Sequence, residues 1–336
     1  MLVDNYKEAL LDAIIGLLWR QWSRLGVMGY EQPGSDSTFL DPEALLIISA
    51  RFARYDPRLY DLTAGWLLRF CRLLNPNRMK SLLGKTSDAD VASLSYLASL
   101  CSQSGDKRWL PLAEKRKGGT LPEATPLFFQ KDGTPLTYCP RPDELAMKCG
   151  FIRNEFIATN KQHRNLPETN ATLLLRSRAL LGVSSRADVA LTLSLSSCNI
   201  QQLVDFCSFA RSSVKEVLDD LETACVVSTI GSHARNVVYV LNHAEEFKQL
   251  LHITAPCYAV HWFKIYSVLM RLWNFVNNPL LSRVSDETVR GELDILFRTE
   301  IQPHLIHCGI PAMQQLTATL LQNLPTLLSE KYFEPA

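Results

Sequence analysis

The densest cluster of residues that could do chemistry lies between Arg51 and Lys85, where eight Lys and Arg residues stand against two Asp residues. Cations gathered in this way neutralise phosphate groups, and each phosphate contact adds salt-dependent affinity for DNA. The segment is predicted to form two helices joined by a short turn, with Arg78 and Lys80 exposed on the second helix. We therefore predict either a helix-turn-helix that holds DNA or a solvated helical face with local ion pairs.

The sequence lacks the motifs of common enzyme classes. It contains no GxxxxGK[ST] or GxGxxG phosphate-binding loop, and neither HExxH nor GxSxG occurs. His304, His307 and Cys308 lie close together in the chain, but a metal site needs further ligands at a geometric spacing. We therefore predict a protein that is not an enzyme, with no catalytic residues, no metal and no cofactor.

The bulk composition is that of an ordinary globular protein. A chain of 336 residues suggests two or three domains, and its net charge of +1 means that any affinity for nucleic acid must come from local charge. Nine cysteines without a CxxC pair indicate free thiols in a reducing compartment. A bacterial cytosol and a nucleus both fit, and we predict a cytoplasmic protein that does not contact a membrane.

Four segments follow from helix signals, prolines and glycines, and they predict a mainly α fold. Residues 1–115 are expected to form a helical domain that includes the basic cluster above. Residues 116–168 are rich in proline and glycine, which predicts an extended connector with one hairpin around Asp132. Residues 169–243 form a separate unit, and residues 244–336 form a second helical domain whose aromatic side chains either fill its core or form a dimer interface.

Two amphipathic helices are predicted inside residues 169–243. Asn199 caps the first helix, and the second starts near Ser212 or Ser213, where Ser213 and Glu216 make a capping box. A short turn joins the two helices, and two β-rich runs after them predict a hairpin. The apolar positions follow the spacing of one-faced helices, with Ile200, Leu203, Val204 and Cys207 in the first and Val214, Val217, Leu218 and Leu221 in the second.

The full order of helix, helix, turn, helix and hairpin describes a winged helix. The earlier helix has Ser185 and Asp188 at capping-box spacing. RALLGVSSRADVALTLSL and IQQLVDFCSFARSSVKEVLDDLETACVVSTIGSHARNVVYVL together resemble the winged-helix domains of MarR- and ArsR-type bacterial transcription regulators. These families usually have glycine before the wing, whereas this chain has Ala224 and Cys225. The step into the wing matches at Leu218, Leu221, Ala224, Val226 and Val227.

The resemblance covers about 75 residues and implies a winged helix-turn-helix domain embedded between helical N- and C-terminal domains. In these families the third helix lies in the major groove of DNA. The implied contacts at the start of that helix are Arg211, Ser212, Ser213 and Lys215. The implied contacts elsewhere are Arg186 on the preceding helix and Ser232, His233, Arg235 and Asn236 at the wing tip.

Two functions are favoured at this stage, and a third, an enzyme with a spatially assembled site, ranks last. The first is a DNA-binding transcriptional regulator or antitoxin-like autoregulator, with double-stranded DNA and a homodimer or protein partner. The second is a non-catalytic assembly subunit that uses the winged helix for protein contacts, because residues 169–243 carry six cations against six acidic residues. DNA binding requires an open positive surface around Arg211 and Lys215, whereas an assembly role predicts that Asp219 and Asp220 cancel it.

Overall fold

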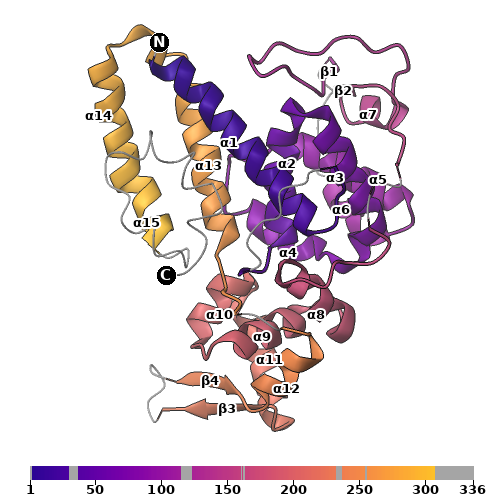
Figure 1. The fold of residues 1–336 in the computed structure, drawn as a ribbon, viewed down its shortest axis with the longest axis vertical. Helices are drawn as coiled ribbons and strands as arrows, with labels where there is room; N and C mark the ends of the chain where they lie inside the picture. Colours follow the sequence, from indigo (N-terminus) through magenta and orange to yellow (C-terminus); the bar gives the residue numbers. More distant parts are fainter. Residues whose placement is uncertain are drawn as a thin grey trace.

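A computed structural model describes residues 2–29, 37–114, 123–159, 161, 163–231, 237–253 and 256–306. Within these ranges the chain is mainly helical, as predicted, with two small two-stranded sheets. Figure 1 shows a large helical body above a smaller part that consists of helices and a hairpin. No helix in the described ranges is long and apolar enough to cross a membrane.

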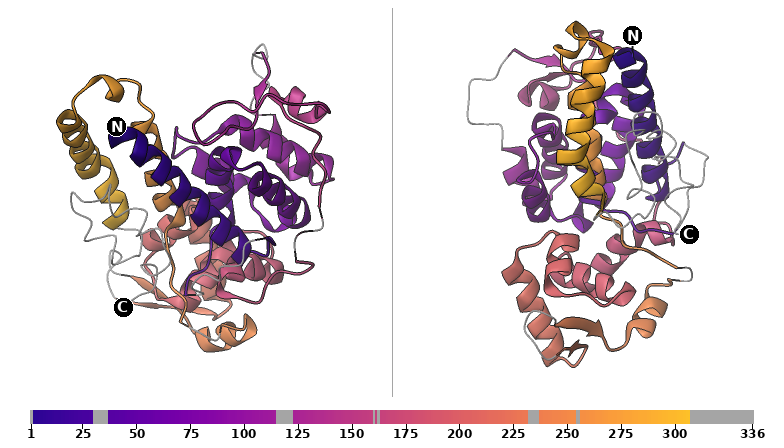
Figure 2. Two further views of the ribbon diagram at one scale, coloured as in Figure 1. Left: turned by 45° about the horizontal axis from the view of Figure 1, so that its top comes forward. Right: turned by 90° about the vertical axis from the view of Figure 1, so that its left-hand side faces the viewer.

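The helical body is built from segments at both ends of the chain (Figure 2). Its helices are α1 (Leu2–Arg24), α2 (Pro42–Phe52), α3 (Pro57–Phe70), α4 (Pro76–Leu83), α5 (Val91–Gln103), α6 (Leu110–Ala113), α7 (Glu144–Lys148), α13 (Trp262–Val276), α14 (Asp286–Leu296) and α15 (Gln302–Ile306). Short 3₁₀ turns occur at Ala53–Tyr55, Cys71–Leu73, Lys107–Trp109, Asn170–Thr172 and Leu281–Arg283, and a π turn occurs at Phe297–Ile301.

One core joins the two ends of the chain, which differs from the predicted division into separate N- and C-terminal helical domains. Trp22 and Trp66 meet edge to face at 5.1 Å, and Tyr266 from α13 donates a 2.6 Å hydrogen bond to Gln21 of α1. The interpretation as core is confirmed for the large side chains of α13 that are buried here, whereas Phe275 is only partly buried. The buried set is Trp262, Phe263, Tyr266, Met270 and Trp273.

Residues 123–159 pack against the body and do not form a free connector. Leu127 and Phe151 are buried in the same core, where β1 (Thr125–Pro126) pairs in parallel with β2 (Phe151–Ile152). The predicted hairpin around Asp132 is confirmed, because Phe129 and Pro135 form an antiparallel bridge across it. The apolar residues between the prolines give this segment a place in the core, although no long helix forms.

The smaller part is defined here as the helix–hairpin unit, residues 185–241. It contains α9 (Ser185–Leu195), α10 (Ile200–Cys207), α11 (Arg211–Thr223) and an antiparallel pair, β3 (Val227–Ile230) and β4 (Val238–Leu241). Val227 lies opposite Leu241 in this hairpin. Two further helices flank the unit. Helix α8 (Leu173–Leu181) lies between the unit and the body, and helix α12 (Ala244–Leu250) packs against the unit.

The caps of the unit agree only in part with the prediction. Asn199 and Gln202 form a complete capping box at the start of α10, which confirms the Asn199 cap. Helix α11 begins at Arg211, two residues before Ser213, and has no side-chain cap. Ser213 therefore lies inside the first turn, and its predicted capping box with Glu216 was wrong. The predicted capping role of Asp188 was also wrong, because its carboxylate is buried in ion pairs.

Candidate nucleic-acid interface

Helix α11 presents one apolar side to the unit and one polar side to solvent. Its apolar side chains form part of the buried core of the unit at the predicted positions, namely Val214, Val217, Leu218 and Leu221. The opposite side begins with Arg211 and Ser212, which are both exposed, and continues to exposed Lys215 one turn later. The N-cap position is Ala210, which provides no side-chain cap, and the first N–H groups of a helix favour anionic ligands.

Neighbouring carboxylates partner the cations of this surface. Lys215 forms an ion pair with Asp219 one turn along α11, and this hydrogen bond raises the pKa of Lys215. Arg186 of α9 reaches Asp220 at 2.5 Å, and both side chains are about half exposed. Ion pairs between exposed side chains contribute at most about 1 kcal/mol, so a phosphate group can displace them.

Arg211 differs from the other two cations because its hydrogen-bond partner is neutral. Its guanidinium donates a 3.3 Å hydrogen bond to the side-chain oxygen of Gln201 on α10. Ser213 is half-buried beside it in the first turn of α11. The positive charge of this surface is therefore concentrated at the N-terminal end of α11. The predicted wing-tip contacts Ser232, His233, Arg235 and Asn236 lie outside the described residues.

The structure contradicts the predicted exposure of Arg78. Its guanidinium is buried between α2 and the end of α10, where it donates to Asp41 at 2.6 and 2.7 Å and to Glu43 at 2.8 Å. Its Nε donates a 2.7 Å hydrogen bond to the backbone oxygen of Cys207. Arg78 therefore has no surface on which to contact DNA. Lys80, on the same helix, is half-exposed.

Two other cations of the Arg51–Lys85 cluster, Arg51 and Arg54, also bond to groups within the body. Arg51 donates to the backbone oxygen of Asp88 at 2.6 Å and to the side chain of Asn274. Arg54 pairs with Asp90 at 2.5 Å. These side chains hold loops of the body together, so the alternative of local ion pairs describes them better than an open phosphate-binding face.

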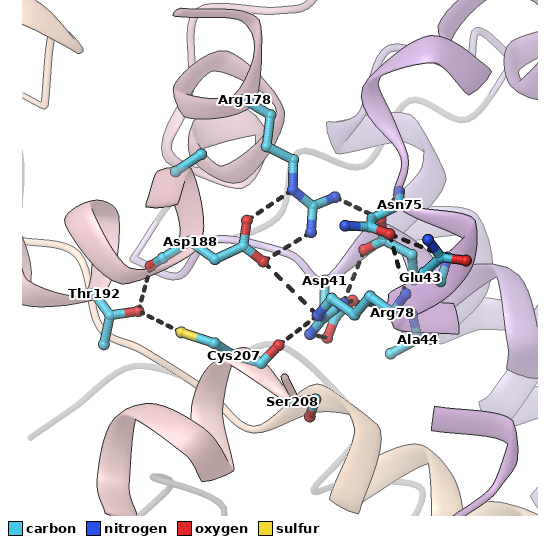
Figure 3. Close-up of polar contacts among 12 residues, drawn as sticks. Asp41, Glu43, Ala44, Asn75, Arg78, Arg178, Asp188, Thr192, Cys207 and Ser208 are labelled. Carbon is cyan, nitrogen blue, oxygen red and sulfur yellow. Dashed lines mark hydrogen bonds and ion pairs between the residues drawn. The ribbon is translucent and has the colours of Figure 1, made fainter. Parts of the chain in front are cut away.

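Arg78 belongs to a buried group of five charged side chains at the junction of the body and the helix–hairpin unit (Figure 3). Arg178 of α8 donates to Glu43 at 2.5 Å and to Asp188 of α9 at 2.8 and 2.9 Å. Burial alone would raise the pKa of Asp41, but Arg78, the backbone N–H of Ala44 and Arg178 together outweigh it and lower that pKa. We call this group the junction network.

The junction network could not be predicted from the sequence, because its members are far apart along the chain and each also fits an ordinary local role. Asp41 is a helix cap, which it also is in the structure, where it accepts from the N–H of Ala44 at 3.0 Å. Among the described residues, no group of three or more His, Cys, Asp or Glu side chains could hold a metal ion.

A scan against protein-family models and searches of curated proteins and of solved structures found no match to this chain. The function is therefore inferred from the geometry above.

Proposed function

We propose that the helix–hairpin unit is a winged helix-turn-helix that binds double-stranded DNA, so that the protein acts as a transcriptional regulator. The observation that carries this proposal is the start of α11, where Arg211 and Ser212 lie exposed beside uncapped backbone N–H groups. Positive side chains, hydroxyls and free N–H groups at a helix N-terminus suit phosphates and base edges in the major groove.

The hairpin supports the same proposal. β3 follows α11 directly and pairs antiparallel with β4 in the smaller part of the molecule (Figure 1). A hairpin placed beside a recognition helix extends the contact surface along the DNA backbone. In the part of the chain that the structure describes, the unit lies at the opposite end of the molecule from α14 (Figure 1).

The test is binding of the purified full chain to a duplex from upstream of its own gene and to an unrelated duplex of equal length, across a salt series. We expect tighter binding to the first duplex. Arg211→Ala and Lys215→Ala should each weaken binding and each reduce the slope of log affinity against log salt by about 1. Lys148→Ala, which removes an exposed cation from α7 of the body, is the matched control and should change neither quantity.

The alternative is a non-catalytic assembly subunit whose helix–hairpin unit binds another protein. The ion pairs Lys215–Asp219 and Arg186–Asp220 favour it, because they balance the charge on the middle of α11. If no DNA is bound even at low salt, the regulator proposal fails. Co-purification of a partner that is lost on Arg211→Ala would then support the assembly role.

A further inference from the structure

The end of α10 is held by a side chain from the helical body. A helix leaves its last carbonyl groups without partners inside the helix, and a cation placed there is favoured by the helix dipole. Cys207 is the last residue of α10, and its carbonyl oxygen accepts the 2.7 Å hydrogen bond from Arg78 Nε. This contact spans 129 residues of sequence and joins α4 to the turn that precedes α11.

The other atoms of the Arg78 guanidinium are fixed by the body. Its two terminal nitrogens donate to Asp41 and Glu43, and all three side chains are almost entirely buried. Glu43 is fixed in turn, because it accepts a 2.6 Å hydrogen bond from the backbone N–H of Asn75 and a 2.5 Å one from Arg178. A planar guanidinium bonded on both edges cannot rotate without losing several charge-assisted hydrogen bonds.

The turn between α10 and α11 is short and directly follows the held carbonyl. Ser208 adopts the left-handed conformation, with φ of 56°, and its N–H still bonds to Val204. Helix α11 starts at Arg211, four residues after Cys207. The first backbone hydrogen bond of this helix runs from the N–H of Val214 to the carbonyl oxygen of Ala210. A change in the position of Cys207 therefore passes directly into the start of α11.

We propose that Arg78 is a positioning residue that sets the orientation of α11 relative to the helical body by capping α10 across the junction. Arg78 thus acts on the candidate interface without touching the ligand. The positioning itself does not require DNA, whereas its consequence, that the body controls how α11 enters the groove, rests on the proposed function.

The test compares Arg78→Lys with Arg178→Lys by amide hydrogen exchange of the full chain. Both variants replace a fully buried guanidinium of the junction network by an ammonium group, which keeps the charge but cannot bond to several partners as a fork. Only Arg78 contacts the turn; Arg178 bonds to Glu43, Asp188 and the backbone oxygen of Leu73. Arg178→Lys therefore controls for the general cost of altering the network.

In Arg78→Lys we expect the amides of Ser208 and Val214 to exchange about tenfold faster, because one charged hydrogen bond is lost. In Arg178→Lys the same two amides should exchange at about the rate that they show in the unaltered chain. Equal effects of the two variants in this turn, or no effect of either, would overturn the proposal. If Arg78→Lys does not fold, Asp41→Asn is the second variant, because it keeps the cap of α2 and weakens the ion pair with Arg78. It must then raise the exchange rates of the same two amides.

Binding measurements on the same preparations separate this inference from the proposed function. With DNA binding established, Arg78→Lys should lower the ratio of affinities for the upstream and unrelated duplexes, and Arg178→Lys should leave this ratio within about twofold of its original value. Faster exchange in the turn without DNA binding by any form would support the positioning role and contradict the regulator proposal instead.

Discussion

At the scale of single residues, the exposed face of α11 has opposite charges at its two ends. Arg211 at the start has a neutral partner, whereas Lys215 is paired with Asp219 on the same helix face. A carboxylate close to DNA repels the phosphate groups. It also forms an ion pair with the cation that would otherwise bind a phosphate group. If the unit binds DNA as proposed, these acidic residues would limit its non-specific affinity, and the N-terminal turn of α11 would be the part that binds.

Asp219→Asn is expected to increase DNA affinity by about two- to fivefold, because it frees Lys215 and removes one repulsive charge. Affinity should be measured at low and at physiological salt, with a smaller gain at the higher salt because of screening. Glu245→Gln removes a comparable exposed carboxylate, paired with Lys248 on α12, and should have no effect. An unchanged affinity in Asp219→Asn would show that this part of α11 does not face DNA.

His261 gives a second residue-scale prediction. Burial, with a smaller contribution from Lys264, lowers its pKa to about 4, while Asp41 and the backbone of Asp205 oppose the shift and Lys85 adds to it. Below pH 6.5 the unfolded chain binds a proton here and the folded chain does not until about pH 4. The free energy of unfolding should therefore fall as the pH drops through this window, by roughly 3 kcal/mol from this group.

His261→Gln should remove this part of the pH dependence, and urea unfolding at pH 7 and pH 4.5 measures it. The exposed residue His243 provides the control, as His243→Gln. A pH dependence as steep in His261→Gln as in the unaltered chain would contradict the assignment to His261.

At the scale of the elements, local sequence signals were reliable where the partner atoms lie within one helical turn. The cap at Asn199 was predicted because a cap and its N–H partner are three residues apart, and the caps at Asp41 and Asn75 show the same short spacing. Ser213 and Glu216 have the same spacing, but α11 starts earlier, at Arg211. Spacing alone does not fix a helix start when the preceding turn ends early.

Asn199→Ala should lower the free energy of unfolding by about 1 kcal/mol, because it removes an observed cap of α10. Ser213→Ala should change it by less than about 0.5 kcal/mol, because Ser213 caps nothing. Chemical denaturation of both variants measures the difference. Equal losses would mean that Ser213 does cap α11, which would contradict a helix start at Arg211.

The burial of Arg78 was not predictable from local sequence. Its partner Asp41 lies 37 residues before it, and Cys207 lies 129 residues after it. A cation among other cations on a short amphipathic helix has the pattern of a solvated or DNA-binding face. Only the packing of α4 against α2 and the approach of the helix–hairpin unit bury it, and these depend on the whole fold.

At the scale of the whole molecule, the junction network couples the helix–hairpin unit to the body. All six tryptophans lie in the body, at positions 19, 22, 66, 109, 262 and 273, so their fluorescence reports on the body and not on the unit. Within the network, Asp188 is the one acidic member that belongs to the unit. If Asp188 loses its charge, the two negative charges of Asp41 and Glu43 still balance the two positive charges of Arg78 and Arg178.

Asp188→Asn should therefore weaken the junction without leaving a buried charge unpaired. In the unaltered chain, we expect denaturant transitions followed by fluorescence and by far-ultraviolet circular dichroism to coincide. In Asp188→Asn, part of the dichroism signal should change at lower denaturant than the fluorescence, with a loss of about 1–3 kcal/mol for the unit. Coincident transitions in this variant would contradict the coupling role of the network.

The most direct test of the regulator proposal is a selection of bound duplexes from a random DNA library by the full chain at physiological salt. If α11 reads the major groove, the bound pool should converge on one motif, and Arg211→Ala should abolish that enrichment. Retention of duplexes without a shared motif would reduce the interface to phosphate binding. A chain that retains no DNA would contradict the proposal and leave protein assembly as the function of this surface.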